Sequence, residues 1–562
     1  MMILLRYIIA ILASLYLGIS FPKNFVVVEK NVMVTMEDGI LLAADVYRPK
    51  SEGKYPVILI RTPYDKTSKE HKYSTLASVF ASQGYVCIVQ DTRGKFCSEG
   101  KFTPYINEAS DGNDTVEWTG KAPWSNGNVA VFGFSYSGTC AWLAATQGNP
   151  HLKTIIPAFV SKDTYAAWFD KGVPYLKDML CWIAQNGTRE RTKDYSDHIE
   201  KVMSSLPVKD LDITISTHKF PAYRNFLENK KPNAFWENIS ANTSENALKT
   251  PSLIIEGWYD RFVQEGINDF TENNKNKLVI GPWGHIPTQK FEEADFGKEA
   301  SFIKSLPTIL PWCDYWLNDD KKTAPEYDVS YFVTGSNEWK TASQWPPENT
   351  SFKKLSLSKS TTSDNILAEE ASSKEFRNTF AYDPKNPMPS IGSDIIYGDD
   401  YIGPRKQDSL VIRDDVVVFA SEPLEEDVTI AGPLKLVVHF SSSAPDTDII
   451  AKISDKHPDG SSYHIQSGFI RTRHRDSLES PSFLEEGVVY AIEVPINSAA
   501  HTFKKGHSIQ LLISSSDFPH HSRNLNTGAD NEETSHYVSA KQTIFYGGDY
   551  DSHILLSVTS DQ

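Results

Sequence analysis

The chain has 562 residues, too many for one ordinary hydrophobic core, so about two to four domains are expected. Its 12 Trp, 25 Tyr and 28 Phe suit large cores and aromatic-lined pockets. The formal net charge of -16 disfavours binding to nucleic acids or anionic membranes, because both require a basic surface. No local run of Lys and Arg reverses this charge.

The first 20 residues carry the pattern of a secretory signal peptide. Arg6 precedes an apolar stretch over residues 7–17, and Gly18 and Ser20 are the small residues before a possible cut after Ser20. The stretch is shorter than the roughly 18 apolar residues of a spanning helix. Export to the periplasm or the medium is therefore expected, with an uncleaved N-terminal anchor as the alternative.

The five cysteines are widely scattered, and their odd number and spacing suggest no disulfide framework. We expect them to be mostly small buried apolar side chains. The usual zinc-site spacings, HExxH among them, are absent, so neither a metal nor a cofactor is expected. The cysteines are Cys87, Cys97, Cys140, Cys181 and Cys313.

Strand-like and helical runs alternate over the first 150 residues. A hairpin is expected over 25–47, and apolar runs follow at 55–61, 85–90 and 129–134. Helical stretches at 73–83 and 138–147 come between or after these runs. Nearly continuous apolar strands that alternate with helices indicate a parallel sheet covered on both faces.

The pattern then changes twice. Helical, charged and aromatic sequence over about 149–249, including 164–186 and 189–206, predicts an inserted helical cap, and strand-like runs resume at 250–257 and 277–281. After about residue 326, short strand-like runs between turn residues predict a β-sandwich or jelly roll. The expected segments are a signal peptide (1–20), a first core part (21–148), the cap (149–249), a second core part (250–350) and a β-domain (351–562).

The sequence Gly133–Phe134–Ser135–Tyr136–Ser137–Gly138 is a GxSxG motif. The motif alone is weak, but here it follows the apolar run VAVFGF and precedes a helix, which is the context of a nucleophile elbow. The glycines permit a sharp turn, and Ser135 would stand at a helix N-terminus, whose dipole favours developing negative charge. The alternative is a βα turn that merely tolerates small residues.

A hydrolase of this type needs an acid and then a histidine, in that chain order. Asp260 follows the strand-like PSLIIEGWY, and His285 follows LVIGPWG, so both lie just past expected strands. The histidine would take the Ser135 proton, and the acid would hold the imidazole in the right tautomer. In isolation either residue reads as an ordinary loop residue; together and in order they predict a triad.

An oxyanion hole needs two donors. The backbone N–H of Tyr136, directly after the nucleophile, is expected to be one. The second is expected from the loop at residues 61–65, where Pro63 has no N–H and Tyr64 offers an N–H or a hydroxyl. The alternative for Tyr64 is simple packing.

In these motifs the chain resembles the cocaine esterase and X-prolyl dipeptidyl-peptidase family of serine hydrolases, which includes glutaryl acylases and α-amino-acid ester hydrolases. The resemblance spans nearly the whole mature chain. The matching segments include IRTPYDK (60–66), QDTRG (90–94), GFSYSGT (133–139), GWYDRF (257–262), GPWGH (281–285), YWLN (315–318), FVTGSNEW (332–339), YDPKNPMPSIG (382–392), SEPLEEDV (421–428), SSSAPDTD (441–448), FKKGH (503–507) and RNLNTG (523–528).

The resemblance implies an α/β fold, with an α/β-hydrolase core, an inserted helical cap and a C-terminal all-β jelly roll of the galactose-binding type. It implies a Ser135–Asp260–His285 triad and an oxyanion hole made by the Tyr64 hydroxyl beside the Tyr136 N–H. One departure is QDTRGKFCSEG (90–100), where a more Gly-rich loop is usual. This departure affects the expected shape of that loop and not the chemistry.

The substrate is less well defined. α-Amino-acid ester hydrolases place carboxylates just after the triad acid to hold an ammonium, whereas Phe262 and Val263 stand there in this chain. This disfavours an α-amino acyl group, although Asp163 or Asp170 of the cap would still be able to serve. Aromatic candidates for the substrate pocket, with packing as the alternative for each, are Tyr165, Trp168, Phe169, Tyr175, Trp182, Trp258 and Phe262.

The leading hypothesis is a serine hydrolase that cleaves a small ester or amide, or a short peptide, through an acyl-enzyme. The first alternative is an X-prolyl dipeptidyl aminopeptidase. The second, from another class, is an inactive binding protein that uses its β-domain to hold a glycan or peptide. The sequence predicts no oligomeric state.

Overall fold

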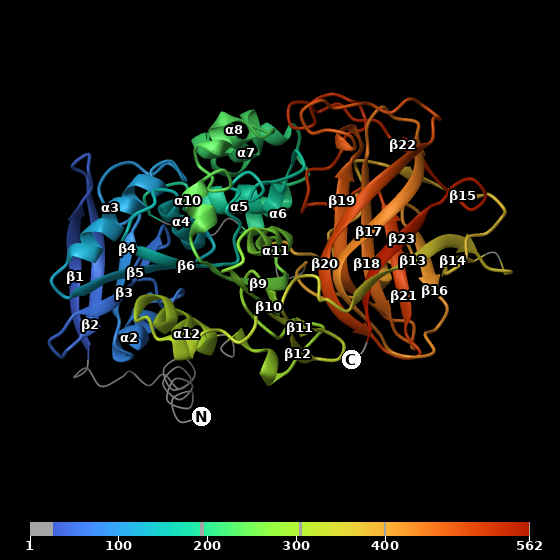
Figure 1. Ribbon diagram of the computed structural model, residues 1–562. Helices are drawn as coiled ribbons and strands as arrows, with labels where there is room; N and C mark the ends of the chain where they lie inside the picture. Colours follow the sequence, from blue (N-terminus) through green and yellow to red (C-terminus); the bar gives the residue numbers. More distant parts are fainter. Residues whose placement is uncertain (1–25, 191–195, 303–305, 363, 398–400, 561–562) are drawn as a thin grey trace.

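The computed structural model describes residues 26–190, 196–302, 306–362, 364–397 and 401–560 (Figure 1). The expected signal peptide lies outside these residues. Among the helices that are described, none has the length and apolar character needed to cross a membrane.

A ten-stranded sheet forms the N-terminal half, in the order β1-β2-β4-β3-β5-β6-β9-β10-β11-β12. From β4 to β11 every neighbouring pair is parallel, as the alternation of strands and helices predicts. The strands are β1 (Val26–Thr35), β2 (Leu41–Pro49), β3 (Tyr55–Thr62), β4 (Val86–Asp91), β5 (Ser125–Phe134), β6 (Leu152–Ala158), β9 (Leu253–Tyr259), β10 (Lys277–Gly284), β11 (Val329–Val333) and β12 (Glu338–Ala342).

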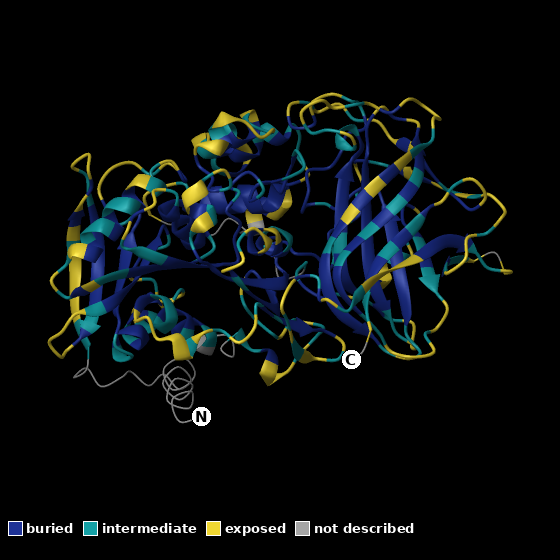
Figure 2. Cartoon of the chain, viewed as in Figure 1, coloured by how far each residue is buried: buried dark blue, intermediate teal, exposed yellow. Residues whose placement is uncertain are grey.

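Helices cover both faces of this sheet. In β3, Val57 and Leu59 point into a core shared with α4, whereas Ile58 and Ile60 point into a second core shared with α2 and α12. This is the alternation that a strand buried on both faces requires, and Figure 2 shows the central strands as buried and the edge strand β1 as largely exposed. The helices are α2 (Tyr73–Ser82), α3 (Glu108–Lys121), α4 (Tyr136–Ala145), α11 (Val263–Thr271) and α12 (Leu306–Leu317).

The helical cap lies between β6 and β9. Its helices are α5 (Leu176–Asn186), α6 (Ser196–Val202), α7 (Leu211–Ser216), α8 (Pro221–Glu228), α9 (Ala234–Glu237) and α10 (Glu245–Lys249).

Two sequence-based predictions about the cap were wrong. The insertion does not begin at residue 149, because β6 belongs to the main sheet. Residues 164–175 are not helical: they turn through the short strands β7 (Phe169–Asp170) and β8 (Val173–Pro174). Gly172, at a φ of +89°, and Pro174 both oppose a continuous helix there.

The C-terminal half is an all-β domain built around a closed barrel of nine strands. Closure arises because β17 pairs with β20 on one side and with β23 on the other. The prediction of an all-β domain is confirmed; its jelly-roll description stays a prediction. The strands are β13 (Thr350–Lys359), β14 (Asn365–Ala368), β15 (Phe376–Tyr382), β16 (Val417–Ser421), β17 (Val428–Ser442), β18 (Asp448–Lys456), β19 (Ser462–Arg471), β20 (Tyr490–Phe503), β21 (Ser508–Ser514), β22 (Ala540–Tyr546) and β23 (His553–Thr559).

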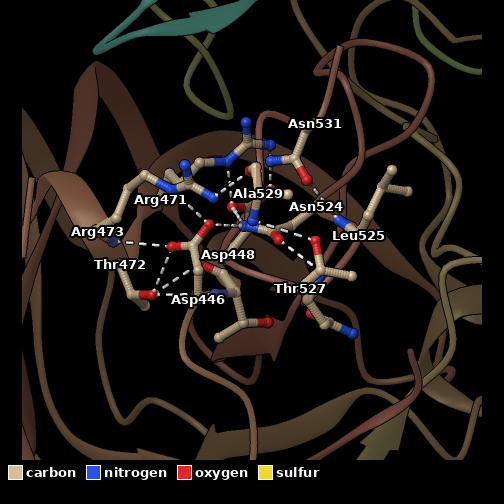
Figure 3. Close-up of polar contacts among 12 residues, drawn as sticks. Asp446, Asp448, Arg471, Thr472, Arg473, Asn524, Leu525, Thr527, Ala529 and Asn531 are labelled. Carbon is tan, nitrogen blue, oxygen red and sulfur yellow. Dashed lines mark hydrogen bonds and ion pairs between the residues drawn. The ribbon is translucent and has the colours of Figure 1, made fainter. Parts of the chain in front are cut away.

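The barrel also contacts the cap through the loop after β21. The Leu176 N–H donates to His520 O at 2.8 Å, and the Lys209 N–H donates to Glu532 O at 3.0 Å. A buried network of polar side chains in the barrel holds this loop (Figure 3). In it Arg471 forms a bidentate pair with Asp448, at 2.8 and 3.0 Å, and donates to Ser522 O. Cap and barrel are thus joined by hydrogen bonds as well as by apolar contact.

All five cysteines are free thiols. Four are buried, in line with the expectation, but Cys97 is exposed in the loop that departs from the family pattern.

Candidate active site

Ser135 stands at the sharp turn between β5 and α4. Its backbone has φ 57° and ψ −130°, a conformation that L-residues rarely adopt, and its side chain is partly exposed. A Cβ on Gly133 would lie 1.9 Å from Ser137 O, and a Cβ on Gly138 would lie 2.5 Å from a Val160 methyl. Both glycines are therefore required by the close packing of the turn, and the strand–turn–helix context of the motif is present.

The three residues of the expected triad lie in one hydrogen-bonded chain. His285 Nε2 lies 2.9 Å from Ser135 Oγ, and His285 Nδ1 lies 3.0 Å from Asp260 Oδ2. Asp260 follows β9 and His285 follows β10, so adjacent parallel strands deliver both side chains to one edge of the sheet. Asp260 is fully buried and His285 is 7% exposed, which shields the pair from water. This arrangement can move the Ser135 proton to the imidazole.

The Tyr64 side chain lies over the nucleophile. Its hydroxyl is 3.4 Å from Ser135 Oγ and accepts a hydrogen bond of 3.1 Å from Trp182 Nε1. The Tyr136 N–H also faces this hydroxyl. Burial raises the pKa of Tyr64, so the hydroxyl keeps its proton at neutral pH and can donate it. Of the two donors expected of Tyr64, the hydroxyl is the one that reaches the nucleophile.

The Tyr136 side chain points away from the site and anchors the elbow. Its hydroxyl donates to Glu108 Oε1 at 3.0 Å, and Glu108 pairs with the buried Arg61 at 2.9 Å. The same hydroxyl accepts the Tyr105 N–H at 2.8 Å. Burial and the Glu108 charge raise the pKa of Tyr136 well above its usual value. The neutral Tyr136 hydroxyl thus makes two hydrogen bonds that fix the residue. Its backbone N–H is the donor expected in the oxyanion hole.

Three of the expected pocket aromatics lie close to the triad. Trp182 holds Tyr64, the Phe262 ring is 5.8 Å from the His285 ring, and the Trp168 ring is 5.5 Å from that of Trp182. These aromatic rings form an apolar wall beside the nucleophile, which suits a hydrophobic group of a substrate.

Three other expected aromatics, Tyr165, Phe169 and Trp258, are packed among side chains of the protein. Tyr165 and Phe169 stack on each other at 5.2 Å inside the cap, and the Tyr165 hydroxyl donates to Lys230 O. Trp258 donates to Phe332 O and packs on Trp345, between the sheet and the barrel. Their assignment to the pocket stays a prediction, because burial in a core and exposure to a cleft give the same sequence pattern. Tyr175 lies against the Arg261 guanidinium, which is 4.9 Å from the tyrosine ring.

Sequence reasoning did not assign a site role to Arg261 or Tyr105. Arg261, the residue after the expected triad acid, is 4% exposed and lies over the rings of Trp168, Tyr175 and Phe262 at 4.6–5.3 Å. Tyr105 stacks on Tyr136 at 4.6 Å. Local sequence carries no signal for a site role of Tyr105. For Arg261 there was a signal, because it directly follows the expected triad acid.

Known proteins share this architecture and these segments. The model of the X-Pro dipeptidyl-peptidase (S15 family) matches residues 38–287, and the X-Pro dipeptidyl-peptidase C-terminal non-catalytic domain matches residues 310–555. Cocaine esterase of Rhodococcus sp. (strain MB1 Bresler) is 33% identical, over 94% of this chain and 98% of that protein. A Xaa-Pro dipeptidyl-peptidase of Ligilactobacillus salivarius (strain UCC118) is 24% identical, over 73% of this chain and 52% of that protein.

Solved structures agree on the fold. An α-amino acid ester hydrolase superimposes with a TM-score of 0.85 at 24% identity, covering 97% of this chain and 99% of that one. An aminopeptidase from a marine sediment Thaumarchaeota archaeon gives 0.83 at 23% identity, covering 96% and 98%. At 33% identity over almost its full length, the chain belongs to the cocaine esterase and X-Pro dipeptidyl-peptidase family, and it is a serine hydrolase of ester or amide bonds.

Proposed function

We propose that Ser135 is the nucleophile of an acyl-enzyme mechanism, with His285 as general base and Asp260 as its orienting acid. The observation that carries this proposal is the continuous chain of hydrogen bonds, 2.9 Å and 3.0 Å long, through the imidazole. Ser135 Oγ attacks the scissile carbonyl while its proton passes to His285 Nε2. The same proton then leaves with the alcohol or amine. Water, deprotonated by His285, releases the acid and restores Ser135.

The oxyanion of the tetrahedral intermediate is proposed to accept hydrogen bonds from the Tyr64 hydroxyl and the Tyr136 N–H. Trp182 supports this role, because its indole N–H bonds to the lone pair of the Tyr64 oxygen and leaves the phenolic proton free to donate. Fixed donors of this kind need no reorganisation during the reaction. An active hydrolase accounts for this geometry better than an inert binding protein does.

We propose a neutral acyl ester as the preferred substrate. The 33% identical relative is named an esterase, and Arg261 places a positive charge next to the aromatic wall. That charge is paired with the buried Asp178 at 3.5 Å, so neither residue offers a free carboxylate to a substrate ammonium. Asp170 is already paired, with His521 at 3.2 Å and Lys171 at 3.4 Å, and Asp163 accepts the Tyr165 N–H at 2.9 Å. Both cap carboxylates are therefore committed to the protein itself.

The X-prolyl dipeptidyl-peptidase is the second candidate, favoured by the S15 family match and by one carboxyl group. Glu265, on α11, is half-buried, and burial together with the Asp170 charge raises its pKa to about 8. The Glu265 charge also acts on Tyr175 of the cap, so the two groups lie near each other. A peptide ammonium would favour its ionised form.

The nucleophile is tested with a fluorophosphonate probe, because an activated serine attacks phosphorus as it attacks a carbonyl. The intact protein should be labelled, and Ser135→Ala should abolish labelling and lower kcat by roughly 10⁶-fold. Ser78→Ala changes a partly exposed serine of α2 whose hydroxyl donates to Ser74 O; it is the matched control and should keep both properties. Labelling that persists in Ser135→Ala would refute the assignment.

The substrate class is tested by comparing kcat/KM for a p-nitrophenyl acyl ester and a Gly-Pro-anilide, corrected for their intrinsic reactivities. We expect the ester to be turned over faster, because an unpaired ammonium in a cleft costs several kcal/mol. A faster anilide would establish the peptidase instead. In that case Glu265→Gln should raise KM for the anilide and leave the ester unchanged.

We propose, from the N-terminal pattern alone, that the protein is exported. N-terminal sequencing of the protein purified from the extracellular or periplasmic fraction tests this. A mature chain beginning after Ser20 is expected. A chain that keeps Met1 and sediments with membranes would establish the N-terminal anchor.

A further inference from the structure

A cluster of histidines surrounds one carboxylate at an end of the barrel. Asp455 is near the end of β18, His457 follows that strand, and His507 precedes β21. β18 and β21 are antiparallel, with Lys456 opposite Ser508. Continued by one residue, this register places His457 opposite His507. The ladder therefore brings together two imidazoles that lie 50 positions apart in the sequence.

The ligand atoms of this cluster are spaced as in a metal site. His507 Nδ1 lies 2.9 and 3.1 Å from the Asp455 oxygens, and His457 Nε2 lies 3.6 Å from Asp455 Oδ2. One ligand atom from each of the three lies within 4.8 Å of the others. Tetrahedral bonds of about 2.05 Å separate ligand atoms by roughly 3.3 Å. We propose that Asp455, His457 and His507 bind a divalent transition metal of the zinc class.

A fourth residue orients the carboxylate. His501 Nε2 lies 3.2 Å from Asp455 Oδ2, and its Nδ1 lies 2.8 Å from Thr334 Oγ1. Metal-binding groups are commonly held by such outer hydrogen bonds, which fix the geometry of the ligand. Thr334 lies directly after β11 of the α/β domain. His501 thus connects the proposed site in the barrel with the hydrolase domain and is a positioning residue.

The chemistry of the ligands suits a metal of this class. Imidazole and carboxylate together favour zinc over calcium or magnesium, which prefer oxygen alone. A neutral imidazole and a carboxylate each offer a lone pair to a metal ion. Asp455 is buried, whereas His457 and His507 are partly exposed. The site therefore has a route for entry and a fourth position open to water.

A second group of the same composition, Asp517, His520 and His521, lacks these properties. It is fully buried, and the Lys452 ammonium lies 3.8 Å from Asp517. His521 is held between Asp517 and Asp170, which raise its pKa to about 9 against the effect of burial. A protonated imidazole and a lysine repel a cation. The proposal is therefore confined to the first group.

Metal binding would tie the end of β18 to the start of β21 and, through His501, to Thr334. Because a ligand that binds only the folded state stabilises it, Zn²⁺ should raise the Tm. The proposal does not rest on the assigned chemistry of Ser135.

The test uses full-length protein without a histidine tag, and Zn²⁺ alone as the probe. Isothermal titration at about pH 7.5 should give one Zn²⁺ per chain. The double variant His457→Ala/His507→Ala should lose this binding, and its Tm should no longer respond to Zn²⁺. His501→Gln should weaken binding by about 10–100-fold while keeping the stoichiometry.

The matched control is His218→Ala/His536→Ala, which removes two exposed histidines outside the cluster. This variant should bind Zn²⁺ like the unaltered protein. Ester hydrolysis by the cluster variant reports that it is folded. The proposal is overturned if the unaltered protein binds no stoichiometric Zn²⁺. It is also overturned if binding survives in an active His457→Ala/His507→Ala protein.

Discussion

The Tyr64 hydroxyl is 3.4 Å from Ser135 Oγ, close enough to reach an oxygen that develops beside it but too long for a strong ground-state bond. We expect Tyr64→Phe to lower kcat by about 10²–10³-fold with little change in KM, because the hydrogen bond matures in the transition state. Steady-state kinetics with an ester for which acyl transfer is rate-limiting provide the measurement.

The comparison variant is Trp182→Phe, which removes the donor to the Tyr64 oxygen and keeps an aromatic ring against Tyr136 and Trp168. Its effect on kcat should be smaller, since the tyrosine proton remains available. If Tyr64→Phe leaves kcat unchanged, the tyrosine is a packing residue and the second oxyanion donor lies elsewhere.

Residues with a fixed chemical context could be predicted from sequence, whereas those defined by packing could not. Ser135, Asp260 and His285 follow strands in a set order, and the sheet brings them together. Trp258 and Trp182 look alike in sequence, yet one fills the space under the barrel and the other holds Tyr64. The histidine cluster escaped prediction because its spacing arises only from the register of two strands.

Buried charge pairs in the barrel support the loops that touch the cap. Arg471 and Asp448 are each at most 2% exposed, and Asn524 also donates to Asp448, at 3.0 Å (Figure 3). Asp448→Ala would leave the guanidinium buried without its partner, which costs about 3–5 kcal/mol. We expect a Tm several degrees lower, measured by calorimetry.

The double variant Asp448→Ala/Arg471→Met separates charge from packing. It removes both charges, so its Tm should recover toward that of the unaltered protein. A double variant less stable than Asp448→Ala alone would show that the pair acts through specific hydrogen bonds, such as the one from Arg471 to Ser522 O.

Elements were predicted best where the strands are continuously apolar. Runs such as 55–61 and 277–281 became β3 and β10 nearly at their expected bounds. β19, SYHIQSGFIR, was not identified because its polar residues hide the pattern, although its backbone bonds are made within the barrel. The aromatic stretch 164–175 has helical composition but is interrupted by Gly172 and Pro174.

At the scale of the whole molecule, His521 joins the barrel to the cap. Its ring lies 3.2 Å from Asp170 of the cap and 3.5 Å from Asp517, and the two carboxylates raise its pKa to about 9 despite burial. Other charged or titratable groups near His521, Asp170 and Asp517 are Lys171, Asp394, Lys452 and His520.

A histidine whose pKa is raised on folding stabilises the protein fully below its unfolded pKa of about 6.5. Between that pH and about 9 the unfolded chain releases the proton while the folded protein keeps it, so the stabilisation, of about 3 kcal/mol, declines and then vanishes. His521→Gln should therefore lower the Tm clearly at about pH 6 and little at about pH 10.

Calorimetry at both pH values measures this difference, with the exposed His218→Gln as the control. A Tm difference equal at the two pH values would mean that the His521 ring acts by packing on Phe469, 4.0 Å away, and not by its charge.

The three residues of the proposed triad all precede residue 286, but the barrel loop that hydrogen-bonds to the cap contains His520 and Glu532. The ribosome therefore synthesises Ser135, Asp260 and His285 long before the barrel loop that hydrogen-bonds to the cap. During synthesis, Ser135 emerges before the barrel loop that contacts the cap. Hydrolytic activity is expected only after the barrel has been synthesised and has folded against the cap.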